Sequence, residues 1–234
     1  MPRYGARPPG RAPLPSPTTP RPGATMPLDL TRRSVAVAPE LLGCLLTSRT
    51  PDGEVTVALT EVEAYEGADD PASHAFRGST RRNAVMFGPA GHAYVYRSHG
   101  IHWCLNVVTG PDGVASAVLL RAGQVVDGQD LARSRRGADV AERALARGPG
   151  NLARALGLTG EDDGTPLDGP RLLLAPAPSP PSEVTSGPRV GVTLAADVPW
   201  RWWVAGEPSV SAYRRSPRAV PVGASGSDTL PACR

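Results

Sequence analysis

The run EVTVALTEVEAY at residues 54 to 65 restricts the fold more than any other part of the chain, because it alternates along its whole length. Side chains that alternate in this way lie on opposite faces of a β-strand. A strand of this length needs neighbours in a sheet to be stable. The face predicted to be apolar ends in two carboxylates and a tyrosine, since it carries Val55, Val57, Leu59, Glu61, Glu63 and Tyr65.

The remaining patterns predict more strands and a few helices. Residues 93–97 and 101–108 are expected to form two strands joined by Ser98, His99 and Gly100, which suits a β-hairpin. Further strands are predicted at 114–121, 189–194 and 200–204, helices at 39–46, 128–136, 139–146 and 151–156, and an extended surface loop at 176–188. This mixture favours an α+β fold, a single compact domain with flanking helices on a curved antiparallel β-sheet.

Composition separates one folded unit from two tails. Residues 1–26 are rich in Pro, Arg, Gly, Ser and Thr and are predicted to be disordered, with Met26 as an alternative start. Residues 214–234 are predicted to be a flexible C-terminal tail, which leaves 27–213 as the domain. The widely spaced cysteines indicate a reducing compartment, and the chain lacks an apolar run of membrane-spanning length and a secretory signal, so we expect a cytoplasmic, monomeric protein.

The basic residues exclude one kind of chemistry and mark one candidate surface. All 25 basic side chains are arginine, so no lysine amine is available to form a Schiff base. The net charge of +3 comes from the ends of the chain, because residues 34–213 hold fifteen arginines and twenty acids. Residues 71–111 nevertheless contain no carboxylate, and they carry all four histidines with Arg77, Arg81, Arg82 and Arg97. We expect this stretch to attract phosphates.

Aromatic residues gather in almost the same stretch. Ten of the fifteen Tyr, Trp, Phe and His residues lie between Tyr65 and Trp103. Aromatic faces stack on nucleobases and arginine neutralises phosphates, so the composition is typical of a surface that handles an extruded base. A hydrophobic core rich in aromatic residues explains the composition equally well, and composition alone leaves both interpretations open.

Several motifs between residues 28 and 213 occur in an ordered series. They are TEVEAY at 60–65, His74 eleven residues after Glu63, Met86-Phe87 followed by Pro89, YVYRSHGIHWCLNVV at 94–108, VLLRA at 118–122 and GPGNLARALGL at 148–158. In order and spacing they resemble the alkyladenine (3-methyladenine) DNA glycosylase family. The resemblance implies a protruding β-hairpin that enters the DNA minor groove, a damaged nucleotide flipped into a pocket, and hydrolysis of the N-glycosidic bond without metal or organic cofactor.

The resemblance gives Glu63 the role of the general base that activates the attacking water. The residues themselves hardly separate it from Glu61, which shares the predicted strand face. Arg121 takes the position of a pocket arginine near the catalytic centre. The resemblance also implies a substrate pocket in which Tyr65, His74 and Tyr96 enclose the flipped base and Asn106 opposes the exocyclic amine of guanine. Core packing for the tyrosines, and an ordinary loop hydrogen bond for His74, are the alternatives.

The predicted hairpin tip departs from the family pattern. His99 stands where better-known members carry a tyrosine wedge that fills the gap left by the flipped nucleotide, so weaker extrusion is expected. Met86 and Leu119 are predicted at the DNA-facing rim, with core packing as the alternative. Arg77, Arg81, Arg82 and Arg97 are candidates for phosphate contacts, and solvated surface arginines are the alternative.

Together these features predict a monofunctional DNA glycosylase that excises alkylated purines from double-stranded DNA, in base excision repair, with deaminated purines as further candidate substrates. A non-catalytic protein that binds damaged or bent DNA on the same fold is the alternative. A metal site is a further alternative because His99, His102 and Cys104 lie close in sequence, but no paired Cys or HxxxH spacing supports zinc. No metal and no cofactor are therefore expected.

Overall fold

The computed structural model describes residues 28–220, so the predicted N-terminal tail and residues 221–234 lie outside it. Within this range, nine strands form one antiparallel sheet. The strands are β1 (Leu45–Thr50), β2 (Gly53–Tyr65), β3 (Ala93–Ser98), β4 (His102–Val108), β5 (Ala117–Asp127), β6 (Ala146–Arg147), β7 (Leu172–Ala175), β8 (Val184–Gly187) and β9 (Arg201–Val204). The main path runs β3-β4-β5-β2-β1-β7, with β6 beside β5 and the β8–β9 pair beside β2.

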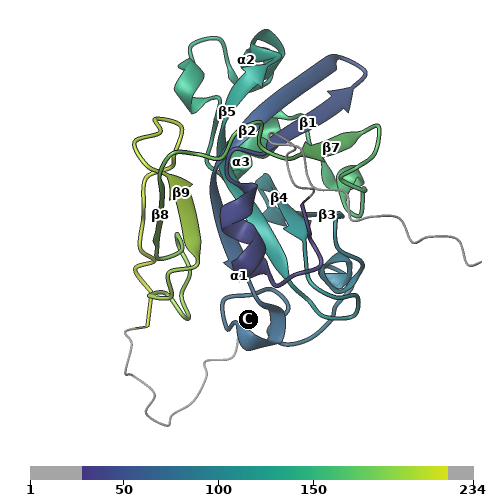
Figure 1. The fold of residues 1–234 in the computed structure, drawn as a ribbon, viewed down its shortest axis with the longest axis vertical. Helices are drawn as coiled ribbons and strands as arrows, with labels where there is room; N and C mark the ends of the chain where they lie inside the picture. The colour runs from purple at the N-terminus through teal and green to yellow at the C-terminus, as the bar shows by residue number, and fades with distance from the viewer. Residues whose placement is uncertain (1–27, 221–234) are drawn as a thin grey trace, which may run out of the picture.

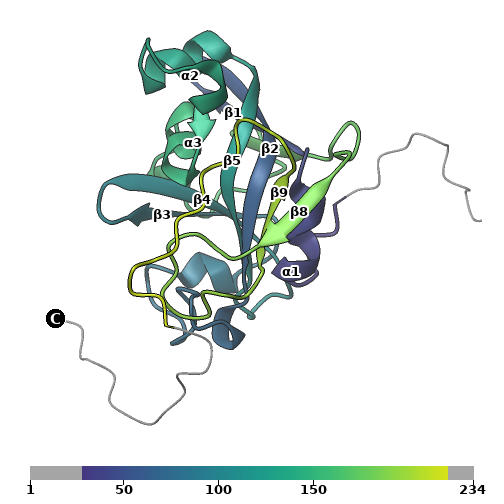
Figure 2. The same cartoon turned by 90° about the vertical axis from the view of Figure 1, so that its left-hand side faces the viewer.

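The helices are short. They are α1 (Ser34–Val37), α2 (Gln129–Arg136) and α3 (Pro149–Ala155), with 3-10 turns η1 (Ala38–Leu41), η2 (Gly67–Asp69), η3 (Ala84–Phe87), η4 (Glu142–Ala144) and η5 (Gly160–Asp162). Figure 1 shows them flanking the sheet, and Figure 2 shows β3 and β4 projecting from it as a hairpin. The predicted α+β fold is confirmed. No helix between residues 28 and 220 has the length and apolar character needed to cross a membrane.

Strand β2 is the centre of the sheet and changes its core-facing side along its length. Its pairing with β5 becomes irregular between Leu59 and Val62. Val55, Val57 and Leu59 lie in the same apolar core cluster as Val62 and Ala64. The prediction that Glu61 and Glu63 continue the apolar face of Val55 is therefore wrong, because the irregularity turns both carboxylates away from the core.

Strand β5 makes the same change opposite β2. Its core residues are Val118 and Leu120 on one side of the irregularity and Val125 on the other. Gly123 lies at the crossing point, where an added Cβ would come within 2.2 Å of Val57 Cγ1 and 2.6 Å of the Ala58 carbonyl oxygen. Only glycine fits between the two strands there without a shift of the backbone.

Other elements differ from the prediction in type or in bounds. The helix expected at 39–46 ends early, because Gly43 has φ +80° and the chain enters β1 at Leu45. The helix expected at 139–146 is only η4 followed by β6, and the strand expected at 189–194 is irregular backbone. The predicted loop 176–188 contains β8, and the strand expected at 114–121 is β5, which begins later and ends later.

Residues 214–220, assigned from the sequence to the tail, contact the segment 191–197. Gly191 N–H donates to the Arg214 carbonyl at 2.9 Å, and Val220 N–H donates to the Thr193 carbonyl at 3.0 Å. Arg215 forms an ion pair with Asp197. This part of the chain therefore lies against one wall of the site described below.

Candidate active site

Strand register aligns side chains from five strands in one row, and four of the five are polar or aromatic. Glu63 in β2 lies opposite Leu119 in β5 and Arg201 in β9. Leu119 lies opposite Asn106 in β4, which in turn lies opposite Tyr94 in β3. Residues in register on adjacent strands point to the same face of a sheet. The row therefore lies on the face opposite Val62, Ala64 and the apolar core.

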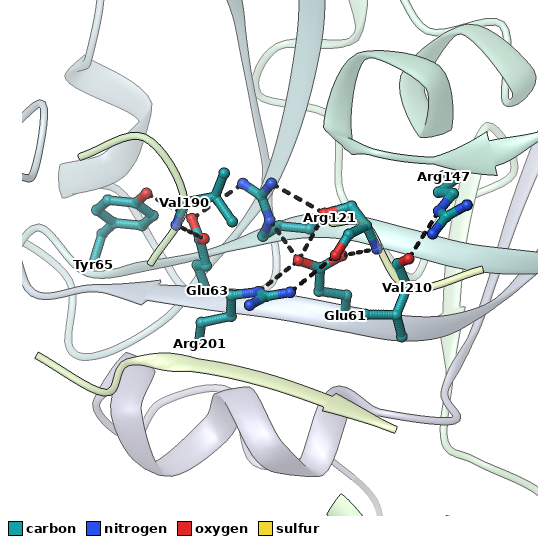
Figure 3. Close-up of polar contacts among 9 residues, drawn as sticks. Glu61, Glu63, Tyr65, Arg121, Arg147, Val190, Arg201 and Val210 are labelled. Carbon is teal, nitrogen blue, oxygen red and sulfur yellow. Dashed lines mark hydrogen bonds and ion pairs between the residues drawn. The ribbon is translucent and has the colours of Figure 1, made fainter. Parts of the chain in front are cut away.

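Glu63 is fully buried, and hydrogen bonds orient both of its carboxylate oxygens. Oε1 accepts from the Val190 N–H at 2.7 Å, and Oε2 accepts from the Tyr65 hydroxyl at 2.8 Å. Nη1 of Arg121 lies 3.3 Å from Oε2 (Figure 3). A carboxylate oxygen has more than one acceptor position, so Oε1 keeps capacity for a further donor such as water.

Glu61, two residues earlier, has a different set of partners. Its Oε1 accepts from Nε of Arg121 at 2.9 Å and from Nε of Arg201 at 2.7 Å. Ser211 donates its N–H to Oε2 at 2.7 Å and its hydroxyl to Oε1 at 2.9 Å (Figure 3). Burial raises the pKa of Glu61, but the two arginines and Ser211 outweigh it, so the pKa lies below its ordinary value. Glu61 is thus an anionic structural centre that accepts four hydrogen bonds.

Arg121 connects the two carboxylates. Burial works to lower the pKa of its guanidinium, but Glu63 and Glu61 raise it above the ordinary value. The guanidinium therefore stays protonated at any physiological pH, and it lies between the two acids (Figure 3). Arg121 thus lies beside Glu63, and its role as a pocket arginine stays a prediction.

A cleft of about 780 Å³ opens on the same face of the sheet. Its lining contains eight of the predicted site residues, namely Tyr65, His74, Met86, Tyr96, Asn106, Arg82, Arg97 and His99. The segment 191–194, which follows Val190, lines it as well. Glu63 lies behind this lining and is linked to it by Tyr65 and Val190.

Three residues expected at this surface are not part of the cleft. Arg77 and Arg81 are exposed but lie outside the lining. Leu119 is buried in the row described above rather than at a rim, which is the packing alternative. Met86 is also buried, and it packs with Tyr94 while it lines the cleft.

The aromatic wall of the cleft is a packed cluster. The rings of Tyr94 and Tyr96 stack with centroids 5.5 Å apart, and the His74 ring meets Tyr96 edge-on at 4.5 Å. The Tyr94 hydroxyl lies 3.1 Å from Nδ1 of His74. Burial raises the pKa of Tyr94 to about 12, and burial with the charge of Arg82 lowers the pKa of His74. Both side chains are therefore neutral at pH 7.

The hairpin tip exposes a histidine. Ser98 lies opposite His102, so the connection is His99, Gly100 and Ile101, one residue later than predicted. His99 has φ +49° and Gly100 has φ +68°. Histidine adopts the left-handed region more readily than most residues do. The tip thus presents an exposed imidazole beside the cleft.

The sequence did not identify several residues that build this site. They are Arg201, Ser211, Arg189 and the Val190 N–H, which come from far along the chain, and Asp70, which follows β2 and binds Arg189. An arginine between tryptophans at 200–203 was the available signal for Arg201, since a charge in an apolar strand needs a buried partner. Within residues 28–220, no three His, Cys, Asp or Glu side chains gather as a metal site requires.

A family model described as methylpurine-DNA glycosylase matches residues 29–208. The chain belongs to this family. A relative from Nocardia farcinica is 56% identical over 191 residues, which cover 78% of this chain and 88% of the relative. Relatives from Streptomyces avermitilis and Mycobacterium leprae are each 52% identical, cover 76% and 82% of this chain, and are covered over 86% and 90% of their own lengths. All three are provisionally named 3-methyladenine DNA glycosylases.

Membership in the methylpurine-DNA glycosylase family confirms the relationship predicted from the sequence motifs. The chain is accordingly a DNA glycosylase, a hydrolase of N-glycosyl bonds whose substrate is DNA.

Proposed function

We propose that this glycosylase flips alkylated purines, foremost 3-methyladenine, out of double-stranded DNA into the cleft and hydrolyses the N-glycosyl bond to leave an abasic site. The observation that carries the proposal is the placement of Glu63. A buried carboxylate, oriented at both oxygens, lies behind the lining of an aromatic cleft of about 780 Å³. Tyr65 and Tyr96 offer faces for stacking on the base.

In this proposal Glu63 accepts a proton from water as the water attacks the sugar carbon and the base departs. The transition state has oxocarbenium character, so a nearby carboxylate also stabilises its positive charge. Arg121, 3.3 Å from the same carboxylate, helps to fix its direction. With no lysine in the chain, the sugar is released to water rather than trapped as a Schiff base.

Strand-break analysis tests the proposal directly. Duplex DNA treated with a methylating agent is incubated with the protein, and abasic sites are then converted to breaks with alkali. We expect breaks well above those produced by a Glu63→Gln control. Binding of the alkylated duplex without breaks above that control would instead favour the non-catalytic binding protein.

Cationic lesions should be released faster than neutral ones. A methylated purine that already carries positive charge is a good leaving group, whereas hypoxanthine must be protonated as it departs. The described lining of the cleft has no carboxylic acid to supply that proton, and the pKa of His74 is lowered. Single-turnover excision of 7-methylguanine and hypoxanthine at matched enzyme concentration measures the difference. Faster release of hypoxanthine would contradict this mechanism.

His99→Ala should weaken binding to lesion duplex by about tenfold, because a residue that stacks in the gap left by a flipped base contributes roughly 1–2 kcal/mol. Single-stranded DNA leaves no such gap, so its binding should hardly change. His92→Ala is the matched control, since His92 lies outside the cleft lining. Fluorescence anisotropy with both substrates gives the comparison. Equal losses on duplex and single strand would refute the wedge role.

A further inference from the structure

Arg189 is a fully buried arginine with no role in the reaction described above. Its Nη1 and Nη2 donate to the two oxygens of Asp70 at 2.5 Å and 2.8 Å. Nη1 also donates to the carbonyl oxygen of Ala64 at 3.0 Å. Ala64 is the residue between Glu63 and Tyr65, so this guanidinium holds the backbone at the centre of the site.

The same guanidinium supports the residues on both sides of Ala64. Its central carbon lies 4.7 Å from the centroid of the Tyr65 ring and 5.3 Å from the centroid of the Trp200 ring. The next residue along the chain, Val190, donates its N–H to Oε1 of Glu63. Arg189 therefore contacts Tyr65 and Ala64 directly and Glu63 through its neighbour.

Stability alone is a poor explanation for this arrangement. A buried ion pair loses the hydration of both charges, and well-packed apolar residues of similar volume are often as stable or more so. The Nε of Arg189 is buried and has no hydrogen-bond partner among residues 28–220. A buried donor left unpaired adds to the cost and calls for a functional reason.

We propose that Arg189, anchored by Asp70, is a positioning residue that holds the Glu63 carboxylate and the Tyr65 ring in the geometry required for base excision. The inference rests on the proposed function of Glu63. Without the guanidinium, the segment 189–194 keeps its tether to the C-terminal segment through Gly191 and Arg214 but loses its anchor at Asp70. The Val190 N–H is then free to move away from Glu63.

Such a displacement should lower the rate of the chemical step more than it weakens binding to DNA. A misplacement of about 1 Å at a catalytic group can reduce a rate about 100-fold. The exposed arginines in the cleft lining, Arg82 and Arg97, form no hydrogen bond or ion pair with Arg189 or Asp70. The affinity for lesion duplex should therefore change little while the excision rate falls.

The experiment compares a double variant, Arg189→Met with Asp70→Leu, with the wild-type protein. Removal of both charges leaves no unpaired buried ion, so the double variant is expected to fold. A matched control is Arg171→Met with Asp162→Asn, because these residues form a largely buried ion pair away from the cleft. We expect the single-turnover rate of the test variant to fall by about 30-fold or more, with Kd for lesion duplex within about threefold. The control should keep the wild-type rate.

A folded double variant that excises at the wild-type rate would overturn the positioning role, as would a rate loss matched by the control pair. If the double variant does not fold, Asp70→Asn tests the same idea, since the amide is nearly isosteric but cannot accept both guanidinium bonds. It should lose rate at unchanged Kd, and a wild-type rate would again refute the role. Arg189→Lys should lose excision rate as well, because an ammonium group cannot make the bidentate contact with Asp70. Failure of the wild-type protein itself to release any base would refute the proposed function instead.

Discussion

Replacement of Glu63 by Gln should reduce the single-turnover rate of base excision by about 10³-fold, within the range expected for loss of a general base. Glutamine keeps the shape of the side chain, and its oxygen can still accept from the Val190 N–H or the Tyr65 hydroxyl. It cannot take a proton from water. The fold and the affinity for lesion duplex should therefore persist while the chemistry stops.

The measurement is release of base from a defined lesion duplex with enzyme in excess, with anisotropy for affinity and thermal unfolding for stability. Leu119→Val is a suitable control, because it changes the neighbour opposite Glu63 without removing an ionisable group. A Glu63→Gln rate within tenfold of wild type would show that another residue activates the water.

Glu61→Ala should act on stability instead, with a loss of about 3–5 kcal/mol, because it leaves the buried guanidinium groups of Arg121 and Arg201 without their shared acceptor. For a domain of this size the unfolding temperature should fall by roughly 10 °C. Since the pKa of Glu61 is lowered in the fold, its contribution is present above the ordinary carboxyl pKa and is lost as the pH falls below it. The difference in unfolding free energy between wild type and variant should thus become smaller at acid pH.

The control for this prediction is Glu54→Ala. Glu54 pairs with Arg49 at 2.6 Å, but both side chains are about 40% exposed, and such surface pairs contribute less than about 1 kcal/mol. Calorimetry on the two variants at pH 7 gives the comparison. If Glu61→Ala lowers the free energy of unfolding no more than Glu54→Ala does, the buried network around Glu61 does not stabilise the sheet.

Local pattern was enough to predict the elements whose signal lies within the element. Strand β2, the β3–β4 hairpin and helices α2 and α3 follow from periodicity and turn residues. Strands β1 and β7 were missed, because short apolar runs do not distinguish a strand from a helix and their identity depends on pairing with each other and with β2. The irregularity near Leu59 was also missed, since it arises from two strands together.

The candidate site could be predicted only in part from the sequence. Tyr65, His74, Tyr96, Asn106 and Arg121 were identified by resemblance, and the structure brings them to one face. What separates Glu63 from Glu61 comes from far along the chain, from Val190 in one case and from Arg201 and Ser211 in the other. No pattern within TEVEAY contains that information.

The central position of β2 affects when this strand opens during unfolding. Its second half is hydrogen-bonded along both edges, to β5 and to β9, and Glu63 lies within that doubly paired part. Amides in such a position exchange with deuterium only through large-scale opening of the sheet. Glu63, the proposed general base, thus lies in the part of the sheet that opens last, so deuterium exchange at its amide should require global unfolding.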